Sequence, residues 1–367
     1  MTFLSSIFGK KKEMSALGVD IGSSSLKVVQ LRSVHGKAVL ETYGELALGP
    51  YAGSIMGQAT NLPAERIADT LKDLLREAKV TTASCGVSIP FARSLLVLVE
   101  LPYREDPKEQ QTIIELEARK YIPVPVSEVQ LDWFIVPPID RSTDTMASAE
   151  SVEPEATKKV EVFLVAVHND ELALLQRSVA AAGLVPSFFE IEIFSTIRAV
   201  VEEPVKPVMV FDIGAATTKT YVVERGVVAL SHSISIGSQD ITRAIASSGN
   251  LSLERAEALK KQEGIEGGGP LGSPELVFSR IFASARRVLM QYETAHKRPI
   301  TSIVLTGGGG VTRSLGIYAK NLFAIDVRVA DPFARCEAPA FMRPVLKEIG
   351  PEFAVAVGLA LLKLSEL

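Results

Sequence analysis

The chain has 367 residues, of which 47% are hydrophobic and 22% charged, and its formal net charge is −4. This composition is ordinary for globular proteins and excludes a disordered, collagen-like or coiled-coil chain. The charge predicts no broad basic surface for nucleic acid, and no apolar run approaches the roughly 18 residues of a membrane-spanning helix. The two cysteines are isolated, which excludes a disulfide scaffold or a CxxC zinc site and fits a reducing compartment.

The first residues of the chain combine apolar side chains with lysines. Phe3, Leu4, Ile7 and Phe8 precede the lysines at 10–12. A secretory signal has its positive charge first, so export is not expected. Two interpretations stay open: a weak contact with a membrane surface or partner, and a frayed terminus.

At roughly 100–200 residues per domain, the length predicts two or three domains. The first strands, over 17–21, 26–31 and 38–46, are separated by Gly and Ser and predict an antiparallel meander. The Ser-, Thr- and Glu-rich residues 140–159 predict a flexible loop. The other elements of this part are a helix over 63–79, strands over 85–89 and 95–101, a helix over 107–121, and strands over 129–136 and 160–167.

The second part of the chain begins with a helix over 169–182, a strand over 184–189 and a helix over 191–201. A second three-strand meander then follows, over 208–213, 219–223 and 227–236. Helices follow this meander and are interrupted by a Gly-rich loop over 264–272. After them come a helix over 274–297, a strand over 303–306 that ends in four glycines and precedes a helix with Leu315 and Tyr318, and a buried helix over 353–362.

One short element occurs twice. Residues 20–27 read Asp-Ile-Gly-Ser-Ser-Ser-Leu-Lys, and residues 212–219 read Asp-Ile-Gly-Ala-Ala-Thr-Thr-Lys. Each copy follows an apolar strand and leads into another strand, so each predicts a β-hairpin. The copies are 192 residues apart, from Asp20 to Asp212, which is far longer than a solenoid repeat and therefore predicts a duplicated domain.

The residue types of this element suit a polyphosphate. Gly22 and Gly214 lack a Cβ where the hairpin turns, so successive backbone N–H groups can form an anion-binding nest. Asp20 and Asp212 would repel phosphate directly, and we expect them to hold Mg²⁺ through its water shell. The other candidate contacts to the phosphates are Ser23, Ser24, Ser25, Lys27, Ala215, Thr217, Thr218 and Lys219. Two ordinary hairpins are the alternative, but the occurrence of both copies favours a site. Neither a P-loop nor a GxGxxG motif is present.

With these motifs the chain resembles the actin-like ATPase superfamily, which includes actin, sugar kinases, Hsp70 and FtsA. The two repeats are similar to its phosphate motifs, and Leu305–Gly310 is similar to its adenosine motif. Residues 190–199 and 354–360 resemble the two helices that connect its halves. The resemblance spans nearly the whole chain and implies an α/β fold of duplicated, ribonuclease H-like halves that binds ATP and Mg²⁺.

Within the superfamily, the chain is similar to the PilM family of type IV pilus assembly proteins, on Gly18–Gln30, Glu115–Pro123 and Pro351–Leu362. The resemblance implies subdomain 1A over 15–93, completed by 168–206 and 352–367, and an inserted subdomain 1C over 94–167. It further implies subdomain 2A over 207–242, completed by 300–351, and subdomain 2B over 243–299.

Family resemblance also implies a function. The implied protein is a cytoplasmic ATP-binding scaffold with weak ATPase activity at most. This scaffold binds the N-terminal cytoplasmic tail of PilN. Such a scaffold would link the inner-membrane complex to the pilus motor ATPases and reach the membrane through partners. An FtsA-like filament former and a metabolite kinase of the same fold are the alternatives.

The resemblance adds site residues outside the hairpins. Glu192 takes the place of the water-orienting residue, with an exposed glutamate at a helix start as the alternative. Glu257 and Lys260 would contact ribose and adenine, or else form a solvated pair on a helix face. Gly307, Gly308 and Gly309 would let the nucleotide approach the backbone. Trp133 and Phe134 are expected to pack the inserted subdomain.

Overall fold

The computed structural model describes residues 15–136, 159–202, 205–267 and 274–367. The apolar N-terminal segment and nearly all of the loop expected over 140–159 lie outside these residues. The chain divides into two compact units, one made of residues 1–91 and 174–367 and the other of residues 92–173. Each unit is described by itself.

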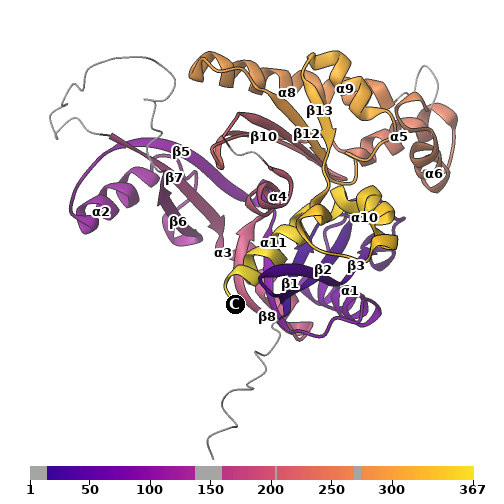
Figure 1. The fold of residues 1–367 in the computed structure, drawn as a ribbon, viewed down its shortest axis with the longest axis horizontal. Helices are drawn as coiled ribbons and strands as arrows, with labels where there is room; N and C mark the ends of the chain where they lie inside the picture. The colour runs from indigo at the N-terminus through magenta and orange to yellow at the C-terminus, as the bar shows by residue number, and fades with distance from the viewer. Residues whose placement is uncertain (1–14, 137–158, 203–204, 268–273) are drawn as a thin grey trace, which may run out of the picture. The chain divides into compact units, whose positions relative to one another are not determined.

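The larger unit contains two five-stranded sheets with the same strand order (Figure 1). In each sheet three antiparallel strands are followed by two strands parallel to the first, so the expected duplication of an α/β fold is confirmed. The first sheet, in the order β3-β2-β1-β4-β8, consists of β1 (Ser15–Ile21), β2 (Ser25–Val34), β3 (Lys37–Ala47), β4 (Ser84–Ile89) and β8 (Val185–Ile191). The second, in the order β11-β10-β9-β12-β13, consists of β9 (Val208–Ile213), β10 (Thr218–Glu224), β11 (Val227–Ile234), β12 (Ser302–Thr306) and β13 (Asp326–Val329).

Helices pack on both sheets of this unit. The core of the second half contains Phe211 from β9 and the fully buried aromatic side chains of Phe278, Phe282 and Tyr292 from one long helix. The helices are α1 (Ala64–Glu77), α4 (Glu192–Val200), α5 (Ser238–Gly249), α6 (Leu253–Glu263), α8 (Pro274–His296), α9 (Leu315–Phe323), α10 (Arg343–Ile349) and α11 (Ala354–Ser365). Short 3-10 helices are η1 (Gly49–Ala52), η6 (Gly264–Glu266), η7 (Pro332–Arg335), η8 (Ala340–Met342) and η9 (Gly350–Phe353).

The last helix, α11, returns to the first half, as expected from the sequence. A Cβ at Gly18 of β1 would lie 2.0 Å from the carbonyl oxygen of Ala356, and a Cβ at Gly358 would lie 1.9 Å from that of Ser195 in α4. Arg198 donates to the carbonyl oxygen of Gly358 at 3.0 Å. Because these glycines have no side chain, α11 lies directly on the backbones of β1 and α4.

The smaller unit is a three-stranded antiparallel sheet, in the order β5-β7-β6, covered by α2. Asp106 caps α2 by accepting a hydrogen bond from the Lys108 N–H at 3.0 Å. Trp133 packs on this core as predicted, and Phe134 stacks on Phe163. The elements are β5 (Ser94–Pro102), α2 (Pro107–Ala118), η3 (Val126–Glu128), β6 (Val129–Ile135) and β7 (Lys159–His168); η2 (Phe91–Arg93) and α3 (Asn169–Ala181) join the two units.

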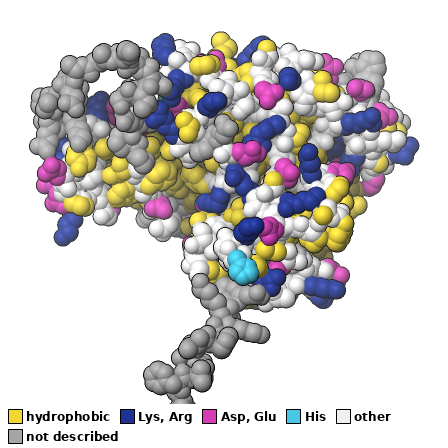
Figure 2. Space-filling model, in the orientation of Figure 1, with side chains coloured by type: hydrophobic (Ala, Val, Ile, Leu, Met, Phe, Trp, Pro, Cys, Tyr) yellow, Lys and Arg dark blue, Asp and Glu magenta, His cyan; other side chains and the backbone are white. Residues whose placement is uncertain are grey.

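Basic side chains are interspersed with acidic and apolar ones on the face shown in Figure 2, as the net charge of −4 suggests. No helix of the described ranges is long and apolar enough to cross a membrane.

Candidate nucleotide-binding site

The two repeated motifs form hairpins with the same backbone geometry. The N–H of Gly22 donates to Ser25 O at 3.1 Å, and that of Gly214 donates to Thr217 O at 2.9 Å. Strand register places each aspartate opposite the lysine of its own motif, Asp20 opposite Lys27 and Asp212 opposite Lys219. The spacing of seven residues therefore corresponds to a cross-strand pair around a tight turn.

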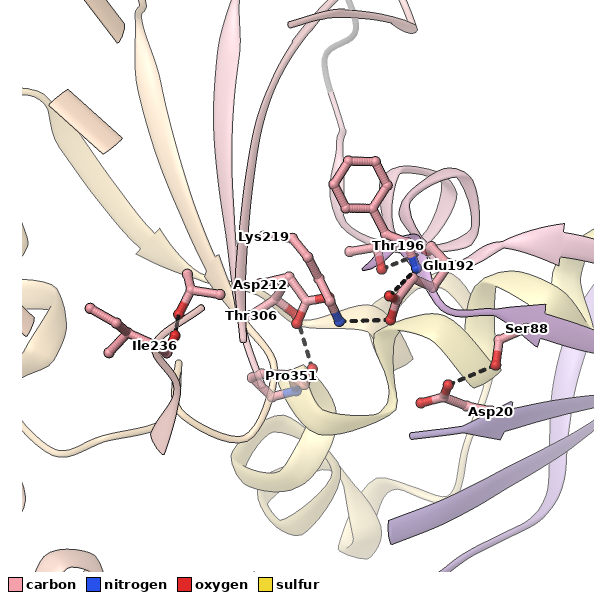
Figure 3. Close-up of polar contacts among 11 residues, drawn as sticks. Asp20, Ser88, Glu192, Thr196, Asp212, Lys219, Ile236, Thr306 and Pro351 are labelled. Atoms are coloured by element: carbon pink, nitrogen blue, oxygen red, sulfur yellow. Dashed lines mark hydrogen bonds and ion pairs between the residues drawn. The ribbon is translucent and has the colours of Figure 1, made fainter. Parts of the chain in front are cut away.

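Asp20 is buried and held by Ser88 of the neighbouring strand β4. The Ser88 hydroxyl donates to Asp20 Oδ1 at 2.9 Å and accepts the Ile21 N–H at 2.9 Å. Burial raises the pKa of Asp20, Lys27 and Lys219 oppose the rise, and Asp212 adds to it. Charged groups of the second half thus act on Asp20, and Figure 3 draws these residues in one view.

Lys219 joins the two halves. Its Nζ lies 2.7 Å from Glu192 Oε2 at the start of α4 and 3.4 Å from Asp212 Oδ2. The two carboxylates keep the pKa of Lys219 above its ordinary value although burial acts to lower it. The ammonium is thus engaged within the protein, as Figure 3 shows.

Glu192 has both carboxylate oxygens occupied. Oε1 accepts the Phe91 N–H at 2.7 Å, while Oε2 faces Lys219. The side chain is buried, so the alternative of an exposed glutamate at a helix start is wrong. Burial raises the pKa of Glu192, Lys219 opposes this, and Asp212 and Asp20 add to it.

The hairpin side chains differ in what they offer a ligand. Lys27 binds Ser25 Oγ at 2.6 Å and Glu45 at 3.1 Å, so its ammonium is not free for phosphate as the sequence suggested. The single hydroxyl proton of Thr218 goes to Ile236 O at 2.8 Å, and we do not retain Thr218 as a donor to a ligand. The residues at the turns that remain wholly or partly accessible are Gly22, Ser23, Ser24, Gly214, Ala215, Ala216 and Thr217.

The glycine loop after β12 lies against the second hairpin. Gly307 has φ +76°, and a Cβ there would lie 2.5 Å from Asp212 Oδ1. A Cβ at Gly309 would lie 2.3 Å from Ile213 Cγ2, and the Gly309 N–H donates to Ile213 O at 2.8 Å. At Gly308 the nearest atom would be 3.8 Å away, in Glu352. The loop therefore requires glycine at 307 and 309 and has room above Gly308.

Glu257 and Lys260 form a buried pair on α6 rather than a solvated face. Lys260 Nζ lies 2.7 Å from Glu257 Oε2, which also accepts the Thr242 hydroxyl at 2.6 Å. Lys260 also donates to Ser238 O at 3.3 Å. Burial lowers the pKa of Lys260, and Glu257 opposes this.

The acidic residues fit a hydrated divalent cation. Asp20, Asp212 and Glu192 are all buried, and Lys219 is the cation placed among them. No group of three or more His, Cys, Asp or Glu side chains that could hold a metal ion directly occurs in the described part of the chain. Asp20 and Asp212, one buried carboxylate from each hairpin, suit Mg²⁺, which keeps several of its waters and is usually bound through one or two carboxylates. The assignment of this site stays a prediction.

Sequence reasoning missed several polar groups of this region. Ser88 holds Asp20, and the Phe91 N–H holds Glu192. Glu352 lies beside Gly308, and its pKa is raised by burial and by Glu45. None of them belongs to a recognisable motif, and each meets its partner only through the tertiary fold.

Residues 18–364 match the family described as type IV pilus assembly protein PilM. A solved PilM–PilN type IV pilus biogenesis complex is 26% identical with a TM-score of 0.79, covering 96% of this chain and 99% of that one. The ethanolamine utilization protein EutJ from Carboxydothermus hydrogenoformans is 13% identical (TM-score 0.56, 95% and 90% covered). MreB 5 of Spiroplasma citri, bound to AMPPNP, is 14% identical (TM-score 0.52, 96% and 96% covered). The last two similarities show a shared actin-like fold.

Proposed function

Because the chain belongs to the family of the type IV pilus assembly protein PilM, we propose that it is an ATP-binding scaffold of type IV pilus assembly. The observation that carries the nucleotide part is the pair of matching hairpins, each with a buried aspartate opposite the lysine of its own motif, together with the 2.7 Å ion pair between Lys219 and Glu192 that joins the halves. The match over residues 18–364 favours this role over an FtsA-like filament former or a metabolite kinase.

The accessible groups of the site suggest how ATP would be held. The turn amides that follow Gly22 and Gly214, those of Ser23, Ser24 and Ala215, would bind phosphate oxygens, and the Gly307–Gly309 backbone would lie against the nucleoside. Asp20 and Asp212 would hold Mg²⁺ through water. The ion, when bound, supplies positive charge to the phosphates.

The state of Glu192 supports stable binding rather than rapid hydrolysis. Lys219 and the Phe91 N–H each hold one Glu192 oxygen at 2.7 Å; each oxygen keeps a second lone pair, but the carboxylate can move toward a water molecule only by releasing one of these contacts. A buried carboxylate that loses such a partner is left uncompensated, which is costly. We therefore expect ATP to hold the two halves together and to shift the population of the scaffold toward one shape.

The partner part of the proposal rests on family and similarity. The 26% identical relative was solved as a PilM–PilN complex. We propose that this chain likewise binds the N-terminal cytoplasmic tail of a PilN-type inner-membrane protein. It would thereby lie at the cytoplasmic side of the membrane and link that complex to the pilus motor.

Calorimetry of Mg²⁺·ATP binding tests the nucleotide part. Asp20→Ala and Asp212→Ala should each weaken binding by about 10–100-fold, the usual effect of removing a group that orients metal-bound water. Asp69→Ala, an exposed aspartate of α1, is the matched control and should bind normally. Unchanged affinity in both site variants would refute the assignment.

Fluorescence anisotropy with a labelled PilN N-terminal peptide tests the partner part. We expect saturable binding that a scrambled peptide does not reproduce, and tighter binding when Mg²⁺·ATP is present. Equal binding of the two peptides would argue against this partner.

A further inference from the structure

A short connection after β3 links the two halves of the larger unit beside the predicted nucleotide site. We call residues 56–60 the strap. At one end, the Thr60 N–H donates to Ser23 O of the first hairpin at 2.8 Å. Next to it, the Ala59 N–H donates to Gln239 Oε1 of α5 at 3.1 Å. Thr60 of the strap is thus hydrogen-bonded to the first half, and its neighbour Ala59 is hydrogen-bonded to the second half.

The other end of the strap lies on the Glu257–Lys260 pair. Gly57 has φ +85°, and a Cβ at this position would lie 3.2 Å from Glu257 Cδ. Glycine allows both the left-handed backbone and this close approach. The strap therefore runs from the predicted adenosine side, at Glu257, to the predicted phosphate side, at Ser23.

Between these two ends lies a buried amide without a partner. Gln58 is 5% exposed, and its Nε2 has no hydrogen-bond acceptor among the described residues. A buried donor left unpaired loses its hydrogen bond to water without gaining another, and this destabilises the folded state. Native proteins rarely keep such a group unless something outside the chain satisfies it.

We propose that Gln58 is a nucleotide contact, and that its side-chain amide donates to a ribose hydroxyl of the bound ATP. The ribose is the part of a nucleotide that lies between base and phosphates, as Gln58 lies between Gly57 and Thr60. Because the strap is bonded to both halves, this contact ties the ribose to the junction between them. The inference rests on the proposed ATP-binding function and adds a residue and a ribose selectivity to it.

The test compares ATP with 2′,3′-dideoxy-ATP by calorimetry in the full chain. Wild type should prefer ATP, and Gln58→Leu, which keeps the side-chain size but has no donor, should reduce that preference by about threefold to tenfold, the worth of one hydrogen bond. The affinity of Gln58→Leu for the dideoxy nucleotide should equal that of wild type. Circular dichroism checks that the variant is folded.

Gln110→Leu is the matched control. Gln110 is also buried with an unpaired Nε2, but it lies on α2 in the other unit. It should leave both nucleotide affinities unchanged.

The outcomes separate the two proposals. If wild type binds ATP and Asp212→Ala does not, but Gln58→Leu keeps the full preference for ATP, the ribose contact is refuted and the proposed function stands. If Gln58→Leu weakens both nucleotides equally, the assignment to ribose is refuted. If wild type binds neither nucleotide, both proposals fail.

Discussion

The two motif lysines occupy equivalent positions in the two copies of the repeated element but form ion pairs with different partners. Lys27 is opposite Asp20 and Lys219 is opposite Asp212, in equivalent registers. Lys27 nevertheless pairs with Glu45 inside its own half, whereas Lys219 reaches Glu192 in the other half. The difference comes from the neighbours and not from the motif.

Removal of the Lys219 charge should destabilise the protein. Lys219→Met would leave Glu192 buried without a cation, which typically costs 3–5 kcal/mol. The free energy of unfolding, measured in urea, should fall by about this amount, and Glu192→Gln added to Lys219→Met should recover much of it. Lys72→Met, which breaks an exposed pair with Asp69, should change stability by about 1 kcal/mol or less. A loss of similar size in both lysine variants would contradict this account.

Glu352 should make stability depend on pH. Because its pKa is raised by burial and by Glu45, its protonated form is favoured in the folded state. The resulting stabilisation is complete below the unfolded value of about 4.3 and is lost as the pH rises through the raised folded value. Glu352→Gln cannot ionise, so its melting temperature relative to wild type should be higher at pH 8 than at pH 4.5. Glu348→Gln, at an exposed position of α10, should give the same difference at both pH values.

At the level of elements, α11 depends on glycine where it meets α4. A Cβ at Gly358 would lie 1.9 Å from Ser195 O, so Gly358→Ala would force two backbones apart. Overpacking of this kind costs about 1–3 kcal/mol, and we expect a lower melting temperature by calorimetry. Gly316→Ala is the control, since Gly316 lies in α9 with no atom within 4 Å of its Cβ position. It should be neutral or stabilising by up to about 1 kcal/mol.

The elements themselves were largely predictable because their signals are local. Alternating apolar residues predicted both meanders, and the Asp-Ile-Gly turns predicted two hairpins whose strand ends at the turn agree with the structure within one residue. Among the strands and α-helices of the described residues, two were not anticipated: β13 has only 4 residues at a sheet edge, and α10 has 7. Segments this short contain too few turns or alternations to show a period.

The side-chain partners within the site were much less predictable. Lys219 meets Glu192 across 27 residues of sequence, and the Ala59 N–H meets Gln239 across 180. Such pairs are created by the packing of whole elements, so no local pattern contains them. For the same reason, the motif alone predicted that the Thr218 hydroxyl donates to a ligand, whereas in the fold it donates to the carbonyl oxygen of Ile236.

For the whole molecule, the duplication means that the proposed nucleotide site would be built from two halves. The strap, α4 and α11 belong to the same compact unit, while residues 92–173 have a core of their own around Val99, Ile114 and Leu164. Nucleotide bound between the hairpins should therefore stabilise one unit selectively.

Hydrogen exchange followed by mass spectrometry tests this selectivity. At 100 times the dissociation constant, a ligand stabilises its host by about 2.7 kcal/mol. Slowly exchanging amides of β1, β9 and α11 should then exchange about 100-fold more slowly with Mg²⁺·ATP present, and those of β7 should be unchanged. Asp212→Ala should abolish the protection. Equal protection of β7 would mean that the two units respond to nucleotide as one.

Lys219 is an internal counterion, and this has a kinetic consequence. Phosphate that arrives at the second hairpin meets an ammonium already shared by Glu192 and Asp212. Phosphate that binds there would have to replace contacts that Lys219 already makes with these carboxylates. It would not meet a free ammonium. Dissolved salt screens exposed charges far more than buried ones. The rate at which nucleotide associates should therefore vary little with ionic strength, unlike that of a site whose lysine extends into water.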